Sequence, residues 1–330
     1  MTTIYTVAAR AGVSAATVSR VFNNRPVSPE KANLVLRVAE ELGFTPNRTA
    51  RSLRRKNSEI IALVIPDIEN PYFTSLARGV EDAAQQRGYS VVLCNTDDDV
   101  VKEAHYLKIA VAEKMAGVII AVAADGTSLS SVLDRDRPVV AVDRVTNYDL
   151  DRVMTDDWAA GYHATEDLLH RGFRRVACIT GPKTTPISNE RARGWSEALH
   201  HNDIEHPELL RYSDWKVDGG RVTLPELLAL PEPPDAVMVT NNLMGIGVVH
   251  ALEAMHIPLR SFGVAVIGDL PFTTISSAVT TIRLPVRDMG NIAVRMLIDR
   301  IEGDDSPPRT VILQNQLIPP VSAGGATTPG

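Results

Sequence analysis

The chain has 330 residues, of which 44% are hydrophobic and 22% are charged, a composition typical of a globular protein with room for two or three domains. No apolar run approaches the roughly 20 residues of a membrane-spanning helix, so we expect no membrane segment. The N-terminus lacks a basic start followed by a long apolar core, which argues against a secretory leader and predicts a cytoplasmic protein.

The net charge of −6 hides an asymmetry along the chain. Residues 1–60 contain ten Lys and Arg against four acidic residues, a surplus of +6, so the remainder carries −12. A basic head on an acidic body indicates that the head contacts a polyanion. A solvated basic face without a partner is the alternative, and composition alone leaves both open.

The two cysteines, Cys94 and Cys178, lie far apart, each in an apolar strand-like run. We interpret them as small buried hydrophobes in a reducing compartment rather than as a disulfide or metal ligands. The sequence therefore predicts no metal site and no cofactor.

Residues 1–46 predict three short helices, the helix-turn-helix arrangement. Thr3 caps the first helix and Gly12 ends it, Ser14 caps the second, and Ser28 with Pro29 starts the third. The side chains expected to face inward on the last two helices are Val18, Val21, Phe22, Leu34, Val35, Val38 and Leu42. Residues 47–58 are basic and predict a hinge segment.

From residue 59, apolar strand-like runs alternate with amphipathic helical stretches, which predicts parallel α/β structure. Strands are expected at 59–66, 89–96, 117–123, 137–143, 174–181, 235–241, 263–268 and 310–318. Helices are expected at 72–88, 100–114, 158–172, 189–201, 243–255 and 287–303. The two series predict two lobes with a cleft, where ligands bind beyond the carboxyl ends of the strands. Residues 321–330 are small and polar, and we expect them to be disordered.

Several stretches resemble, in order, the LacI/GalR family of bacterial transcription regulators. They include "TVAARAGVSAATVSRVFNN", "AEELGFTPNRTARSL", "IPDIENPYF", "VAVDR", "TDDWAAGYHATEDLLHRG", "VTNNLMGIG" and "VTTIRLP". The resemblance covers all but the tail and implies an α/β fold class with an N-terminal all-α helix-turn-helix head, a hinge, and a two-lobed periplasmic-binding-protein-like effector domain over 59–320. Lobe one would span 59–155 plus 284–312, and lobe two 156–282 plus 313–320. The family works as a homodimer. The tail lacks the leucine heptads of tetrameric members, so we expect a dimer.

The resemblance also implies a palindromic double-stranded DNA operator as a partner. Ser14, Thr17, Ser19 and Asn23 carry short polar groups suited to phosphate contacts. Arg20 follows Ala16 by one turn on the same face and fits the O6 and N7 atoms of guanine, with a phosphate contact as an equal alternative. Ala15 and Ala16 match positions that set operator preference, although both are also good helix formers.

The hinge carries the remaining expected DNA contacts. Asn47 and Arg48 match phosphate-contacting positions of the family. Ala50, Arg51 and Leu53 fall in the segment that enters the minor groove, where the family's leucine acts as a wedge that kinks the duplex.

Polar and aromatic side chains near strand ends are expected to bind a small-molecule effector. They are Asn70, Tyr72, Phe73, Asp143, Arg191, Trp215, Asn241 and Asp269. This set of side chains suits a sugar or sugar-like metabolite as the ligand. A nucleobase and a phosphorylated metabolite are the alternative ligands. Two departures from the family pattern bear on the ligand. The segment after residue 268 is short, so Asp269 either replaces the usual carboxylate or fails to reach, and Asn242 stands where Asp is common.

These observations predict a DNA-binding repressor controlled by an effector. The sequence leaves open whether the effector releases the protein from DNA or promotes its binding. The alternative is a soluble sugar receptor of the periplasmic type, which shares the body fold but needs a leader and no DNA-reading head. We expect no enzymatic activity, because the sequence has no phosphate-binding glycine loop after the first strand, no G-x-S-x-G and no H-E-x-x-H.

Overall fold

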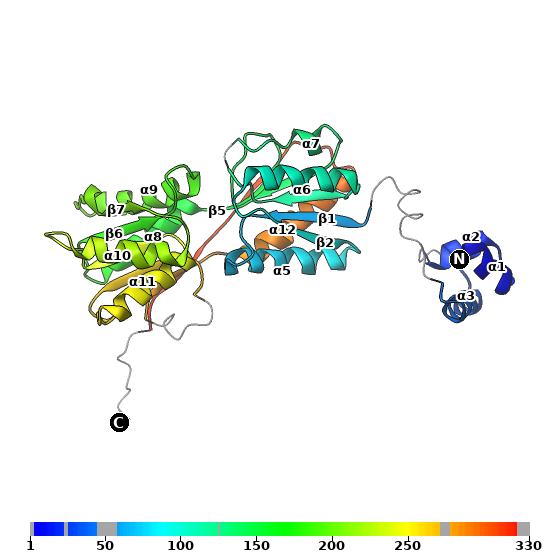
Figure 1. The fold of residues 1–330 in the computed structure, drawn as a ribbon, viewed down its shortest axis with the longest axis horizontal. Helices are drawn as coiled ribbons and strands as arrows, with labels where there is room; N and C mark the ends of the chain where they lie inside the picture. Colours follow the sequence, from blue (N-terminus) through cyan, green and yellow to red (C-terminus); the bar gives the residue numbers. More distant parts are fainter. Residues whose placement is uncertain (1–2, 23–25, 45–57, 125, 271–277, 322–330) are drawn as a thin grey trace, which may run out of the picture. The chain divides into compact units, whose positions relative to one another are not determined.

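The computed structural model describes residues 3–22, 26–44, 58–124, 126–270 and 278–321 (Figure 1). Internal contacts divide the chain between Ser58 and Glu59 into two compact units, and each is described by itself. Within the described residues, no helix combines the length and the apolar character that crossing a membrane requires.

The first unit contains three helices in the described part, α1 Ile4–Arg10, α2 Ala15–Phe22 and α3 Pro29–Glu41. The Thr3 hydroxyl accepts a hydrogen bond from the Thr6 backbone N–H, and Ser14 Oγ accepts one from the Thr17 N–H at 3.1 Å. Both expected caps are therefore present. Between them, Gly12 takes φ +63°, the left-handed conformation that lets the chain turn sharply from α1 into α2.

The core of this unit is small. Val18, Val35 and Val38 are buried in it, as expected from their spacing. One expectation for α3 was wrong. The Leu34 side chain is 37% exposed because it lies beside the buried stripe rather than in it. Ser28 and Pro29 start α3 at the N-cap and in the first turn, as expected, although the Ser28 side chain makes no capping hydrogen bond.

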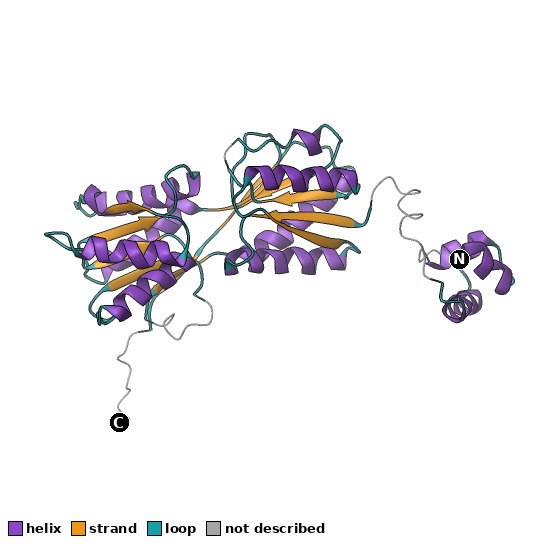
Figure 2. Cartoon of the chain, in the orientation of Figure 1, coloured by secondary structure: helices purple, strands orange, loops and turns teal. Residues whose placement is uncertain are grey.

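Within the described residues, the second unit contains two six-stranded sheets, each covered by helices (Figure 2). The first sheet has the order β11-β5-β4-β3-β1-β2 and the second β12-β10-β9-β8-β6-β7. All pairs are parallel except β10 with β12. The strands are β1 Ile60–Ile65, β2 Ser90–Asn95, β3 Gly117–Ile120, β4 Val139–Val142, β5 Asp151–Thr155, β6 Val176–Thr180, β7 Leu210–Tyr212, β8 Ala236–Val239, β9 Gly263–Ile267, β10 Thr280–Arg283, β11 Thr310–Leu313 and β12 Gln316–Ile318.

The helices lie largely where the sequence places them. They are α5 Pro71–Gln86, α6 Val100–Ala112, α7 Ser130–Leu133, α8 Asp157–His170, α9 Pro186–His200, α10 Val217–Leu228, α11 Asn242–Ala254 and α12 Val286–Ile301. The short helix α7, the longer helix α10 and the strands β5, β7 and β10 are additions to the expected elements. Both cysteines are buried, and burial raises the pKa of both thiols.

The chain passes between the lobes three times. After β5 in the first sheet, α8 packs on the second, and after β10 in the second sheet, α12 packs on the first. The expected single strand at 310–318 is in fact two strands, β11 and β12, in different sheets. Asn315 lies between them, and its Nδ2 donates to the Asp156 carbonyl at 2.7 Å, which ties the third crossing to the first.

Glycines bring the helices of both lobes into close contact in pairs. A Cβ atom on Gly161 of α8 would lie 2.0 Å from the backbone oxygen of Arg191, and one on Gly194 of α9 would lie 2.1 Å from that of Trp158. The same reciprocal contact joins α5 to α12 and α10 to α11, through Gly79, Gly290, Gly220 and Gly247. Only glycine permits backbones to approach this closely, so these residues set the distance between paired helices.

We expect Gly161→Ala to lower the free energy of unfolding by about 1–3 kcal/mol, because the added methyl group must push α9 away. Urea denaturation of the variant and of the wild type measures the change. His163→Ala, an exposed position on the same helix, is the control and should change stability by less than about 0.5 kcal/mol. Equal stability of Gly161→Ala and wild type would show that the two helices do not depend on this contact.

Candidate functional site

Helix α2 presents an exposed face that contains Ser14, Ala16 and Arg20. Thr17 is half-buried, and its hydroxyl lies 2.9 Å from that of Ser14. Ala15 differs from Ala16, because it packs against the core of the first unit and is half-buried. The methyl of Ala16 is therefore the more accessible of the two for contact with a base.

Of the other expected DNA contacts, Ser19 is half-buried on α2. The remaining ones lie outside the described residues; they are Asn23, Asn47, Arg48, Ala50, Arg51 and Leu53. Tyr5 on α1 is 72% exposed, a feature that the sequence analysis did not predict. Its position beside the inward-facing Ile4 and Val7 places it off the apolar stripe of that helix, and the sequence pattern contained this information.

A cavity in the second unit is lined by residues of both lobes. Seven of the eight expected effector residues line it, namely Asn70, Tyr72, Phe73, Asp143, Arg191, Trp215 and Asn241. Asp269 is the exception. Gly268 lines the cavity, but the Asp269 carboxylate accepts a hydrogen bond from the exposed Arg283 at 3.1 Å. The expectation that Asp269 serves the cavity does not hold in this structure, because Arg283 engages its carboxylate at the surface.

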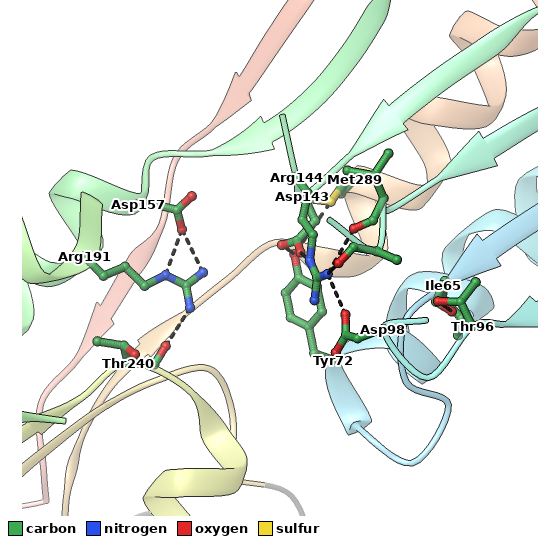
Figure 3. A network of polar contacts seen from close by, with 12 residues as sticks. Ile65, Tyr72, Thr96, Asp98, Asp143, Arg144, Asp157, Arg191, Thr240 and Met289 are labelled. Atoms are coloured by element: carbon green, nitrogen blue, oxygen red, sulfur yellow. Dashed lines mark hydrogen bonds and ion pairs between the residues drawn. The ribbon is translucent and has the colours of Figure 1, made fainter. Parts of the chain in front are cut away.

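Arg191 forms the centre of the lobe-two wall (Figure 3). Its Nε and Nη2 atoms lie 2.8 and 2.7 Å from Asp157 Oδ1, and Nη1 donates to the Thr240 carbonyl at 2.6 Å. Burial raises the pKa of Asp157 to about 6, although the positive charge of Arg191 acts in the opposite direction. The guanidinium thus joins α9 to the start of α8 and to the end of β8.

The half-buried Tyr72 and the buried Asp143 form a second cluster on the lobe-one wall (Figure 3). The Tyr72 hydroxyl donates to Asp143 Oδ1 at 2.5 Å. Burial, and then the adjacent carboxylate, raise the pKa of Tyr72 well above its usual value, so the phenol stays a donor. Asp143 adopts φ +64°, a conformation that is uncommon outside glycine and that occurs where surrounding structure enforces it.

Trp215 provides an aromatic plate that the backbone holds in place. It also has a positive φ, of 66°, and its carbonyl accepts a hydrogen bond from Asn241 Nδ2 at 2.8 Å. The Oδ1 atom of Asn241 caps α11 by accepting from the Met244 N–H. The indole lies where a side chain on Gly181 would stand, so that glycine makes room for the ring. Asn241 therefore serves both as the helix cap and as a support of the cavity wall.

The structure adds charged residues that sequence reasoning missed. Asp67, Asp98, Arg144 and Lys216 line the cavity, as does Asn242. Arg144 Nη1 lies 2.6 Å from Asp98 Oδ1, and Lys216 Nζ lies 2.6 Å from Asp67 Oδ2. Lys216 belongs to lobe two and Asp67 to lobe one, so this pair joins the lobes. Asp67 lies two residues after the end of β1, which was a usable indication, but its partner is 149 residues away in sequence.

A helix-turn-helix unit joined to two α/β lobes around a polar and aromatic cavity defines a ligand-responsive DNA-binding regulator. The chain belongs to the LacI family. Residues 3–47 match the family described as bacterial regulatory proteins of the lacI family, and residues 58–319 match the periplasmic binding proteins and sugar binding domain of the LacI family.

Individual relatives agree with this assignment. The chain is 35% identical to the ribose operon repressor of Halalkalibacterium halodurans over 92% of this chain and 91% of that protein. It is similar to the solved complex of the transcriptional regulator CelR with cellobiose, with 29% identity, a TM-score of 0.71 and coverage of 96% and 98%. The Lac repressor bound to ONPG shares the fold, with a TM-score of 0.83 at 24% identity over 96% and 98% of the two chains.

The raised pKa of Asp157 predicts a pH dependence of stability. The folded chain binds this proton more tightly than the unfolded chain does, so the contribution to stability is complete below pH 3.8 and is lost as the pH rises to about 6. Asp157→Asn mimics the protonated carboxyl and does not titrate.

We therefore expect the unfolding free energy of the wild type, minus that of Asp157→Asn, to fall by up to about 3 kcal/mol between about pH 4 and pH 7. Urea denaturation of both proteins across this range measures the difference. A difference that stays constant or increases with pH would contradict the assignment.

Proposed function

We propose that this protein is a repressor that binds a palindromic operator as a homodimer and that a neutral, hydroxyl-rich effector in the inter-lobe cavity sets its operator affinity. The observation that carries the proposal is the pairing of charges in that cavity. Each of the three cations that line it, Arg144, Arg191 and Lys216, already has a carboxylate partner.

This pairing favours an uncharged ligand. A phosphate or carboxylate group would need a free cation. Freeing Arg191 would leave the buried Asp157 carboxylate without its partner, which is costly. The Asp143 carboxylate adds a further negative charge, which accepts a hydrogen bond from the Tyr72 phenol and shares Arg144, whose Nε lies 4.0 Å away, with Asp98. Hydroxyl groups instead match carboxylate and amide acceptors beside aromatic rings. Two relatives, a ribose operon repressor and a regulator solved in complex with cellobiose, support a carbohydrate ligand.

The DNA-reading face is proposed to comprise Ser14, Ala16, Thr17, Ser19 and Arg20, with Asn23 and the hinge residues Asn47, Arg48, Ala50, Arg51 and Leu53. Arg20 is exposed one turn beyond Ala16, where its forked guanidinium suits a guanine edge. Tyr5 joins the proposal as an exposed aromatic hydroxyl suited to a phosphate. A DNA-binding role places the protein in the bacterial cytoplasm and makes it a regulator rather than an enzyme or a periplasmic receptor.

We propose that the effector controls DNA binding by changing the relative position of the two lobes. Lys216 follows the aromatic plate Trp215 directly and contacts Asp67 in the other lobe, so a ligand against Trp215 acts next to an inter-lobe contact. The coupling free energy between two sites linked by such a rearrangement is typically about 1–3 kcal/mol.

The charge proposal predicts that neutral sugars bind and their anionic counterparts do not. We expect D-ribose or D-glucose to bind at least tenfold more tightly than D-ribose 5-phosphate or D-gluconate, measured by calorimetry. Asp98→Asn removes the carboxylate that occupies Arg144 and should narrow this preference. Tighter binding of either anion to the wild type would contradict the proposal.

For DNA binding, we expect Arg20→Ala to weaken binding to the operator by about 1–3 kcal/mol and to relax sequence preference at one base pair. Fluorescence anisotropy with the operator and with single-base variants measures both effects. Arg37→Ala, which removes an exposed positive charge from α3, is the matched control and should leave sequence preference unchanged. A uniform loss across all sequences for Arg20→Ala would assign Arg20 to a phosphate instead.

A further inference from the structure

One ion pair joins the two lobes at the cavity. Lys216 Nζ of lobe two lies 2.6 Å from Asp67 Oδ2 of lobe one, and both residues line the cavity. Every other ion pair between two described residues lies within a single lobe. In the part of the chain that the structure describes, this pair is therefore the only ionic connection between the lobes.

Both ends of the pair are held by the backbone of their own lobe. The carboxylate of Asp67 is shared, because Oδ1 accepts a hydrogen bond from the Glu69 N–H at 2.9 Å while Oδ2 accepts one from Lys216. The Lys216 N–H donates to Asp214 Oδ1 at 2.9 Å, and the neighbouring Trp215 is fixed by a hydrogen bond to its carbonyl. A wide opening of the cavity must therefore separate Lys216 from Asp67.

Lobe one surrounds the Lys216 ammonium group with negative charge. The hydrogen bond to Asp67 raises the pKa of Lys216 above its usual value, and partial burial acts in the opposite direction. The charges of Asp67, Asp98 and Glu69 add to the increase. Asp98 also has a cation of its own lobe, Arg144. Among the described residues, Lys216 is the only cation that pairs with Asp67, so opening the cavity would leave a carboxylate that is 15% exposed without a partner.

We propose that Lys216 and Asp67 form an ionic clamp that holds the lobes together over the cavity, so that the affinity for an uncharged effector depends on ionic strength. This inference rests on the proposed function, because it concerns the same effector. A ligand between Trp215 of lobe two and Tyr72 of lobe one contacts both walls, and it therefore binds best to the arrangement that the clamp favours. Because the Lys216 side chain is 54% exposed, dissolved salt screens its attraction to Asp67.

The clamp makes Lys216 a positioning residue whose effect depends on its charge. Lys216→Arg keeps the charge, whereas Lys216→Met keeps much of the length of the side chain and removes the charge. Asp67→Asn removes the charge from the opposite lobe and keeps an oxygen for the Glu69 N–H. If the pair acts as a unit, the double variant Lys216→Met with Asp67→Asn should bind no more weakly than either single variant.

The test is the salt dependence of neutral-sugar binding. By isothermal titration calorimetry with D-ribose, D-glucose and cellobiose, we expect the wild type to bind at least one sugar about three- to fivefold more weakly in about 0.5 M than in about 0.05 M NaCl. Lys216→Met and Asp67→Asn should each lower the affinity at low salt by a similar factor and remove most of the salt dependence. Lys216→Arg should retain it. Lys102→Met is the matched control, because Lys102 pairs with Asp97 inside lobe one at 2.5 Å, and it should behave as wild type.

A second measurement needs no ligand. Acrylamide quenching of Trp215 fluorescence, taken as the difference between each protein and its Trp215→Phe derivative, reports how accessible the cavity is. We expect this quenching to increase with NaCl in the wild type. In Asp67→Asn, which changes the lobe opposite Trp215, quenching should already be high at low salt.

Three results separate the two proposals. Salt-dependent sugar binding in the wild type and Lys216→Arg, but not in Lys216→Met or Asp67→Asn, supports the clamp. Sugar binding with the same affinity and salt dependence in all four proteins overturns the clamp and leaves the proposed function standing. If no sugar binds, the proposed function falls and the quenching decides: equal quenching of Trp215 in the wild type and Asp67→Asn overturns the clamp, and higher quenching in Asp67→Asn supports it.

Discussion

The effector domain depends on one buried guanidinium. Arg191 joins α9 to the start of α8 through Asp157 and to the end of β8 through the Thr240 carbonyl. A buried cation is tolerated only when it is paired and hydrogen-bonded, so these three segments must meet at fixed distances. Backbone packing fixes the distance between α8 and α9, because Gly161 lies directly against the carbonyl of Arg191. The packing of two helices thus positions a wall of the effector cavity.

The other polar groups that line the cavity are paired in the same way. Tyr72 with Asp143, Arg144 with Asp98 and Lys216 with Asp67 are each satisfied by one another before any ligand enters. On the proposal of a neutral effector, such a site selects its ligand by shape and by hydroxyl hydrogen bonds rather than by charge. It also places the inter-lobe contact of Lys216 next to the aromatic plate of Trp215. Ligand recognition and lobe position therefore involve neighbouring residues.

The local sequence pattern predicted most of the strands and helices. It did not predict contacts between residues that are far apart in the sequence. The apolar runs predicted β1 and β9, since buried parallel strands need no alternation. Helix α10 was missed because Gly219, Gly220 and Pro225 are poor helix formers, and close packing on α11 overrides that preference.

The sequence predicted β11 and β12 as one strand because Asn315 alone, without a neighbouring Gly or Pro, marks the crossing between them. Seven cavity residues were predicted from their places at strand and helix ends and from the resemblance to the family. The ion pair of Lys216 and Asp67 was not, because no local pattern specifies a contact between two lobes.

The central claim is that a neutral, hydroxyl-rich ligand in the cavity changes the affinity of the protein for its operator. The most direct measurement is a titration of the protein against a palindromic operator from its own promoter, with and without saturating neutral sugars and glycosides, at one fixed salt concentration. The account predicts binding well above that to random DNA, and a shift in operator affinity of about 5- to 150-fold with at least one neutral ligand. Binding no stronger than that to random DNA, or an operator affinity that responds only to anionic ligands, would contradict it.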